Sequence, residues 1–287
     1  MARSKARRRQ DLPSAAQSPE SKKRDRAGGS APSRTGLLLY GSHAVRAALV
    51  NPRRRCHQLL LTEEAERREG ARLIDLVEGR AKAPRIERVE RQHLDQLLPG
   101  AVHQGVVLEA SPLSPPPLQQ FLRDLPEGPA LLLLLDQVTD PHNVGAILRS
   151  AAVFGAAAVV APERHAAPEG GALAKAASGA LELVPYLREV NLARCLDHLK
   201  QAGFWVLGLA GEAPQSLADF DPPERIALCL GAEGTGLRRL TREGCDILLS
   251  LPAAGDFRDL NVSNAAAVAL FALSAKRLAA GSKEAGD

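Results

Sequence analysis

Aromatic side chains are scarce in this 287-residue chain: they make up 3% of the residues, although 45% are hydrophobic. Proteins that grip nucleic acid by base stacking depend on aromatic surfaces. The composition therefore argues against a stacking platform as the main means of binding RNA or DNA. Ala, Leu and Val carry the apolar content, which is enough for a real core in one large domain or two ordinary ones.

Metal-binding cysteine patterns are also missing. The four cysteines, at positions 56, 195, 229 and 245, form no C-x-x-C motif, and no histidine pair lies near them at zinc-ligand spacing. We therefore expect no metal site. Scattered thiols without a pairing pattern favour a reducing, cytoplasmic location.

Long apolar runs are absent as well. No run reaches the roughly 18 residues of a membrane span, and the basic N-terminus is not followed by the apolar segment of a secretory signal. An organelle transit peptide is disfavoured because acids interrupt the N-terminal segment. The sequence predicts no membrane association.

Charge is distributed unevenly. Residues 1–34 hold ten Lys/Arg and three Asp/Glu, so this tail carries +7, while the whole chain carries +4 and the remainder therefore −3. A tail rich in charge, Ser, Pro and Gly is expected to be disordered. Two interpretations stay open: an arm attracted to a nucleic-acid backbone, and a solubility tail.

Two folded domains are expected after the tail. Short strands and helices alternate over residues 35–110, which predicts a small α/β unit. The segment "SPLSPPPLQQ" at 111–120 has four prolines in ten residues, so we expect a linker over 111–124. The second domain is expected over 125–287.

The second domain is predicted to contain a parallel sheet. Short apolar stretches without polar alternation are separated by helix-like segments, a pattern typical of parallel strands buried on both faces. The predicted strands are 130–135, 157–161, 181–186, 204–209, 225–230 and 247–251. In such an α/β sheet, ligands bind beyond the carboxyl ends of the strands.

The first polar cluster at such an end is "DQVTDPHNVGAILRS", residues 136–150. Asp140 and Pro141 predict a helix start, with the helix running to about residue 154. Gly145 and Arg149 share one face, and we interpret the glycine as clearing space beside the arginine. With Asn143 they would make a donor-rich patch for a ligand backbone. The alternative is a surface helix whose arginine pairs with a nearby acid.

The second cluster, "IALCLGAEGTGLRRL" at 226–240, predicts a strand, a glycine-rich turn and a helix. Its glycines are Gly231, Gly234 and Gly236. Arg239 stands where the dinucleotide fingerprint would need its last glycine, so that fingerprint fails. Glu233 in the turn would repel a pyrophosphate, which favours a cationic or neutral ligand. Taken alone, the segment also fits an ordinary βα turn.

The third cluster follows a strand that ends at Leu251 and Pro252. A loop leads into a long alanine-rich helix, with Asn261, Ser263 and Asn264 at its start. These residues are first of all helix-capping residues. Their hydroxyl and amide groups would also face the crevice at the strand ends.

Together the three clusters resemble the SpoU (TrmH-type) family of RNA 2′-O-ribose methyltransferases. The resemblance covers nearly all of 36–280, and "YGSHAVRAAL" and "HQGVVLEA" resemble that family's N-terminal substrate-binding domain. The closest branch, by "GSHAV" and "GAEGTGLRRLTREGCD", is that of the 23S rRNA guanosine 2′-O-methyltransferases. Members of that branch modify a guanosine in the peptidyl-transferase loop.

The resemblance implies a specific architecture. The catalytic domain would be a SPOUT-type α/β domain whose C-terminal segment forms a deep trefoil knot, an exception among folds. Residues 35–110 would be an L30e-like RNA-binding domain. The resemblance further implies S-adenosylmethionine as cofactor, 23S ribosomal RNA as substrate, and a homodimer with the site near its interface.

The resemblance also assigns site residues. The expected catalytic residues are Asn143, Arg149, Glu233, Asn261 and Ser263. The expected cofactor-binding residues are Gly231, Gly234, Leu251 and Leu260. Two positions depart from the family pattern: Asp259 stands where many members have serine, and Ala253 where many have methionine.

The sequence leaves two alternative functions open. One is a tRNA ribose methyltransferase on the same scaffold. The other is a non-catalytic RNA-binding or ribosome-assembly factor, which would be expected to have lost Asn143, Arg149 or Asn261; all three are present. For the enzyme, we expect Arg149 to clamp a phosphate and stabilise charge, because a guanidinium hardly gives up its proton.

Overall fold

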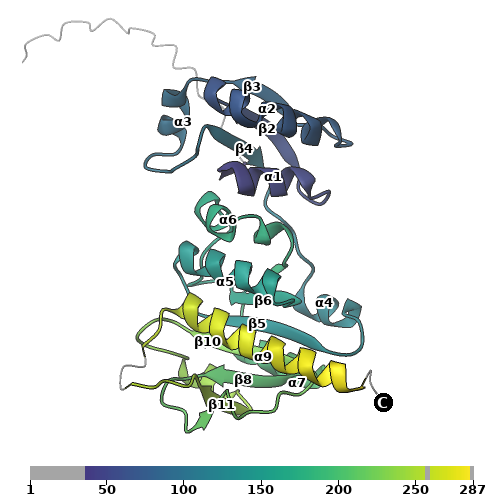
Figure 1. Ribbon diagram of the computed structural model, residues 1–287, viewed down its shortest axis with the longest axis vertical. Helices are drawn as coiled ribbons and strands as arrows, with labels where there is room; N and C mark the ends of the chain where they lie inside the picture. Colours follow the sequence, from purple (N-terminus) through teal and green to yellow (C-terminus); the bar gives the residue numbers. More distant parts are fainter. Residues whose placement is uncertain (1–35, 256–258, 285–287) are drawn as a thin grey trace, which may run out of the picture. The chain divides into compact units, whose positions relative to one another are not determined.

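The computed structural model describes residues 36–255 and 259–284 (Figure 1). The predicted disordered tail, residues 1–34, lies outside the described residues. The described elements form two sheets with helices, and none of the described helices is both long and apolar enough to cross a bilayer.

The first sheet has four strands in the order β1-β4-β2-β3. Strand β4 pairs antiparallel with β1 and β2, whereas β2 and β3 are parallel. Its strands are β1 (Leu37–Tyr40), β2 (Cys56–Leu61), β3 (Arg85–Arg88) and β4 (Val106–Ala110), and its helices are α1 (Ser42–Val50), α2 (Glu63–Glu78) and α3 (Arg91–Leu97). Residues 35–110 thus contain the mixed α/β elements that the sequence predicts.

The second sheet has seven strands, all parallel, in the order β7-β6-β5-β10-β8-β11-β9. They are β5 (Ala130–Asp136), β6 (Ala158–Pro162), β7 (Tyr186–Glu189), β8 (Trp205–Leu209), β9 (Gln215–Ser216), β10 (Arg225–Gly231) and β11 (Ile247–Ser250). The accompanying helices are α4 (Leu118–Asp124), α5 (Pro141–Val153), α6 (Gly171–Ala177), η1 (Ala180–Glu182), α7 (Leu192–Gln201), α8 (Arg239–Glu243) and α9 (Val262–Glu284).

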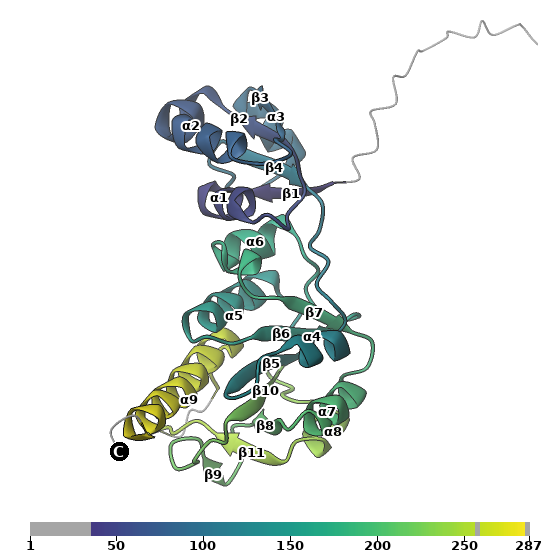
Figure 2. The same ribbon diagram turned by 90° about the vertical axis from the view of Figure 1, so that its right-hand side faces the viewer.

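Helices cover both faces of this sheet (Figure 2). Along β5, Leu131, Leu133 and Leu135 pack with apolar residues of α5 and α9, whereas Leu132 and Leu134 pack with those of α4 and α7. All seven residues of β5 are buried. The continuous leucine run is therefore explained by burial on both sides, and the predicted parallel α/β sheet is confirmed.

One predicted strand, 181–186, is wrong. Residues 180–182 form the 3₁₀ helix η1, and the strand β7 begins only at Tyr186. Glu182 turns inward because its carboxylate pairs with the guanidinium of Arg54, whose side chain is fully buried. An apolar composition cannot reveal this ion pair, since its partner lies far away in the sequence.

Helix α5 starts where the sequence predicts. The Asp140 side chain accepts a hydrogen bond of 3.0 Å from the backbone N–H of His142, and Pro141 occupies the first turn.

The interpretation of Gly145 as clearing space beside Arg149 is wrong. A Cβ at this position would lie 2.5 Å from the Cβ of Ala176 and 2.8 Å from the backbone N of Ala177. Gly145 therefore permits close packing of α5 on α6, and makes no room for a ligand.

We expect Gly145→Val to lower the free energy of unfolding by about 2–3 kcal/mol, because overpacking a closed contact forces α5 and α6 apart. Gly170→Val is the matched control: Gly170 has an extended backbone and its nearest neighbour would be 3.8 Å away. Denaturant titration of both variants measures the effect. Equal stability of the two variants would show that the α5–α6 contact is not tight.

Candidate active site

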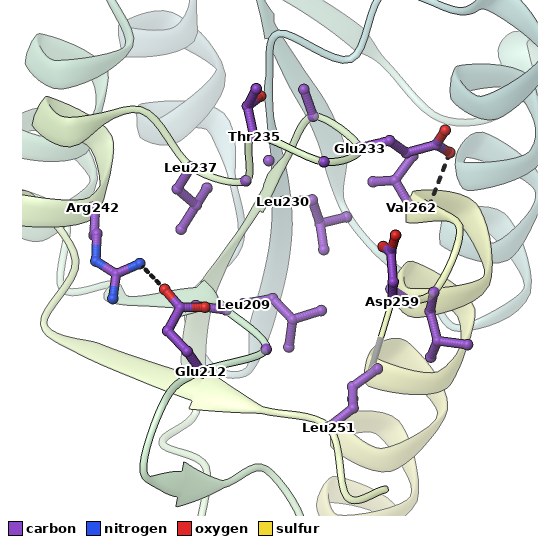
Figure 3. A pocket seen from close by; sticks show the side chains of 18 of the residues that line it. Leu209, Glu212, Leu230, Glu233, Thr235, Leu237, Arg242, Leu251, Asp259 and Val262 are labelled. Carbon is purple, nitrogen blue, oxygen red and sulfur yellow. Dashed lines mark hydrogen bonds and ion pairs between the residues drawn. The ribbon is translucent and has the colours of Figure 1, made fainter. Parts of the chain in front are cut away.

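A cavity of about 680 Å³ opens at the carboxyl ends of β8, β10 and β11 (Figure 3). This is the edge at which parallel α/β sheets bind ligands, and the volume is that of a small-molecule site. Three loops supply most of the lining: 209–212 at the end of β8, 231–237 at the end of β10, and 251–253 with 259–260 after β11. All four residues predicted to bind the cofactor, Gly231, Gly234, Leu251 and Leu260, line it.

The loop 231–237, which we call the glycine loop, folds back on the end of β10. The N–H of Gly236 donates to the carbonyl of Ala232 at 2.9 Å. Gly234 and Gly236 have φ values of +75° and +66°, which disfavour any other residue. A Cβ at Gly231 would lie 2.1 Å from the carbonyl carbon of Gly236. The glycines thus serve the tight fold of the loop itself.

The cavity combines apolar walls with carboxylates. Leu209, Leu230 and Leu251 are among the lining residues, and Arg242 pairs with Glu212 across one side (Figure 3). A hydrogen bond from its own backbone N–H, followed by the Arg242 guanidinium, lowers the pKa of Glu212, so it is ionised at neutral pH. With Glu233 and Asp259 also in the lining, carboxylates outnumber cations here. This charge suits a cationic or neutral ligand.

Asn143, Glu233 and Asn261 form one hydrogen-bonded cluster, which we call the amide–carboxylate cluster. Glu233 Oε1 accepts from Asn143 Nδ2 at 2.9 Å and from Asn261 Nδ2 at 2.6 Å. Asn261 Nδ2 also donates to Asn143 Oδ1 at 3.0 Å. The backbone N–H of Val262 donates to the same Glu233 oxygen at 3.3 Å (Figure 3). Residues 90 and 118 positions from Asn143 thus meet at one point.

Ser263 joins this cluster through the start of α9. Asn261 Oδ1 accepts from the backbone N–H of Ser263 at 2.9 Å and from that of Asn264 at 3.4 Å, which caps the helix. The Ser263 hydroxyl also donates to Asn261 Oδ1, at 2.5 Å. Asn261 thus caps α9 through its oxygen, as the sequence predicts, and its nitrogen binds Glu233 and Asn143.

Arg149 lies apart from the amide–carboxylate cluster. Its exposed side chain lines a second cavity of about 580 Å³, together with residues 177–180 and Val153. Six residues along a helix advance it by about 9 Å and turn it by about 240°, so Asn143 and Arg149 point in different directions. The expected single patch containing both residues is wrong for one copy of the chain.

Sequence reasoning missed Leu209, Glu212 and Arg242 as lining residues. The signal was present, because Glu212 follows the end of a predicted strand. Recognising it required the strand order, in which β8 lies between β10 and β11. Order in a sheet is a long-range property that the local sequence does not report.

Among the residues that the structure describes, no group of three His, Cys, Asp or Glu side chains is placed to hold a metal ion.

Comparison with known proteins identifies the family. The model of the SpoU rRNA Methylase family matches residues 130–271, and the model for RNA 2′-O ribose methyltransferase substrate binding matches 38–116. A 23S rRNA (guanosine-2′-O-)-methyltransferase RlmB from Ralstonia nicotianae is 47% identical over 82% of this chain and 93% of its own length. The chain belongs to the SpoU rRNA methylase family. The RlmB of Escherichia coli (strain K12) is 41% identical over 82% of this chain and 96% of its own length.

Solved structures of SpoU methyltransferases share the fold. AviRb from Streptomyces viridochromogenes has a TM-score of 0.71 at 23% identity, covering 85% of this chain and 91% of its own. The same protein was solved in complex with the cofactor AdoMet, with a TM-score of 0.70. A TrmH-family protein from Porphyromonas gingivalis has a TM-score of 0.65 at 25% identity, covering 83% and 89% of the two chains.

Both positions that depart from the SpoU pattern, Ala253 and Asp259, line the cavity. Asp259 adds a carboxylate there.

Asn261 caps α9 through its oxygen and binds Glu233 through its nitrogen, and a substitution can separate these two functions. In Asn261→Asp one oxygen still caps α9, but the other replaces the nitrogen that lies 2.6 Å from Glu233, so two carboxylates meet. We expect the free energy of unfolding to fall by about 1 kcal/mol at pH 7, because the two carboxylates repel each other. The loss should shrink towards pH 5, because like charges raise the pKa of one partner and its protonation relieves the repulsion.

Asn191→Asp is the matched control, since Asn191 caps α7 through the N–H of Arg194. We expect the free energy of unfolding of this variant to change by no more than about 0.5 kcal/mol. Denaturant titrations at the two pH values measure both variants. The same pH-independent effect in both would contradict the shared hydrogen bonding of Glu233.

Proposed function

We propose that this chain transfers a methyl group from S-adenosylmethionine to the ribose 2′-oxygen of a guanosine in 23S ribosomal RNA. The main support is the amide–carboxylate cluster beside the 680 Å³ cavity. The chain is also 41–47% identical to RlmB enzymes over most of its length. RNA as substrate also supports a cytoplasmic location.

The residues of the cavity fit S-adenosylmethionine. Leucine side chains offer an apolar wall for the adenine ring, and the turned backbone of the glycine loop exposes groups that recognise polar edges. Glu212 and Asp259 suit the positive charge of the ligand. When bound, this cofactor supplies an electrophilic methyl group on a sulfonium centre.

Glu233 is best suited to organising the site. Its Oε1 accepts three hydrogen bonds, from Asn143, Asn261 and Val262. An oxygen so engaged is held in place, so we assign it the role of fixing the two amides. The ribose hydroxyl would then be positioned by the amides and by Ser263, and positioning supplies much of the rate.

Arg149 is assigned to the RNA backbone. A guanidinium stays protonated, so it binds phosphate and stabilises developing negative charge. Its exposed place beside the second cavity lets it meet RNA from a surface distinct from the amide–carboxylate cluster.

We further propose the finer architecture that the family resemblance implies. Residues 35–110 would be an L30e-like domain, 111–124 a linker and 125–287 a SPOUT domain with a C-terminal trefoil knot. The pairing of β10 between β5 and β8, and the packing of α9 on α5, support a threaded C-terminal segment. Within the proposed linker, residues 118–124 form helix α4 and Leu118 is buried.

A homodimer is supported by exposed apolar side chains on α5 and α9. Val153 is 76% exposed, Phe271 62% and Val268 46%. The rings of Phe154 and Phe271 lie 6.2 Å apart, so these side chains belong to one region. Clustered large apolar residues at the surface mark an interface, and Arg149 on α5 would lie close to it.

The dimer has its own test. We expect Phe271→Lys to turn a dimeric protein into a monomer at about 10 μM, because a charge at an apolar interface is costly. Val190→Lys is the control, since Val190 is 84% exposed and follows β7. Light scattering measures the mass. A monomeric unmodified chain, or a dimeric Phe271→Lys, would contradict the assignment.

The relatives favour ribosomal over transfer RNA, since both RlmB proteins are named as acting on 23S rRNA. A non-catalytic factor is disfavoured because Asn143, Glu233 and Asn261 are present and hydrogen-bonded. The purified chain, tritium-labelled S-adenosylmethionine, and 23S rRNA or tRNA test this. We expect one 2′-O-methylguanosine in the peptidyl-transferase loop. Label in tRNA alone, or on a base, would overturn the proposal.

In the same assay we expect Arg149→Ala to bind S-adenosylmethionine normally but to lose at least about 100-fold in methyl transfer, the scale of one electrostatic stabiliser. Arg194→Ala is the control, because Arg194 is an exposed arginine on α7. Near-normal turnover by Arg149→Ala would remove the arginine from the mechanism.

A further inference from the structure

A buried carboxylate lies behind the proposed cofactor site. Asp136 is the last residue of β5, the side chain is 0% exposed, and its strand is otherwise apolar. Burying a carboxylate is costly unless it is paired and hydrogen-bonded. The lining of the 680 Å³ cavity does not include Asp136, so the residue does not act by touching a ligand there.

Both oxygens of Asp136 bind one residue, Arg238. Oδ1 accepts from Arg238 Nε at 2.6 Å, and Oδ2 accepts from the Arg238 backbone N–H at 2.9 Å. The side-chain bond neutralises the buried charge. The backbone bond fixes the main chain at position 238, so the carboxylate controls the path of the chain as well as the placement of a side chain.

Arg238 directly follows the glycine loop. The loop starts at Gly231, which is the register partner of Asp136 in the parallel pairing of β5 and β10. Asp136 therefore lies opposite the first residue of the loop and binds the residue that follows its last one. This closes the loop at both ends on a single point of the sheet.

The loop needs such closure. Gly234 and Gly236 adopt positive φ values, and nothing lies within 4 Å of a Cβ built at either position. Glycines are conformationally free, and residues 234–236 are exposed, so this part of the loop has little side-chain packing to hold its turned conformation. Its internal bonds join Gly236 to Ala232 and Thr235 to Glu233, and the Glu233 side chain is held by Asn143 and Asn261. The contacts of Asp136 add a constraint at the ends of the loop.

We infer that Asp136 and Arg238 are a positioning pair that holds the glycine loop in the conformation that binds S-adenosylmethionine. The inference rests on the proposed function of this cavity. It concerns residues that act through the loop, not catalytic residues.

The test starts with Arg238→Ala in the full-length chain. We expect at least a 10-fold rise in the dissociation constant for S-adenosylmethionine by calorimetry and a matching rise in its KM, with kcat at saturating cofactor within about 2-fold. Arg239→Ala is the matched control, because Arg239 is the next residue and pairs only locally with Glu243, at 2.8 Å. The control should bind like the unmodified chain.

A second substitution separates positioning from stability. Arg238→Ala leaves the Asp136 carboxylate unpaired and should lower Tm; adding Asp136→Asn removes that charge and should restore much of the Tm. We expect the cofactor affinity of the double variant to stay at least 10-fold weakened, because the bond from the Arg238 side chain to position 136 is still missing. Affinity that returns together with Tm would overturn the inference.

The outcomes also distinguish this inference from the proposed function. If the unmodified chain binds S-adenosylmethionine and Arg238→Ala binds it equally well, the positioning pair is refuted and the cofactor site stands. If the unmodified chain does not bind S-adenosylmethionine, the proposed function of the cavity is refuted, and the inference with it.

Discussion

The parallel pairing of β5 with β10 is the contact on which the site depends. Seven residue pairs join the two strands, from Ala130 with Arg225 to Asp136 with Gly231, across a gap of 95 positions in the sequence. Because parallel strands end at the same edge, the segment that follows β5 meets the glycine loop that follows β10. The Asn143–Glu233 hydrogen bond and the Asp136–Arg238 ion pair both cross this junction. Buried leucines on both faces of β5 hold the junction in place.

Local features of the chain could be read from the sequence with good accuracy. The Asp140 cap, the start of α9 at Asn261 and five of six strands follow from patterns that involve near neighbours. Features that depend on distant partners were missed or misread. Residues 181–186 looked like a strand because their buried ion pair with Arg54 is invisible locally. Gly145 looked like space for a ligand because the α5–α6 contact is also long-range.

The candidate site follows the same division. The motifs, with the family resemblance, identified four positions that line the cavity and the members of the amide–carboxylate cluster, because these lie at strand ends and a helix start. They did not identify Glu212, whose strand β8 lies between β10 and β11. They also placed Arg149 with Asn143, although helix geometry turns the two apart. We therefore propose that two surfaces serve the reaction: the cavity binds the methyl donor, and the surface with Arg149 presents a cation to RNA.

We propose that the loops after β8, β10 and β11 form the methyl-donor site. Hydrogen exchange of the full-length chain, with and without S-adenosylmethionine, tests it most directly. We predict slower amide exchange in 209–212, 231–238, 251–253 and 259–262, the segments that line or anchor the cavity, and unchanged exchange in β1 to β4. Protection confined to other segments, or none at saturating cofactor, would contradict it.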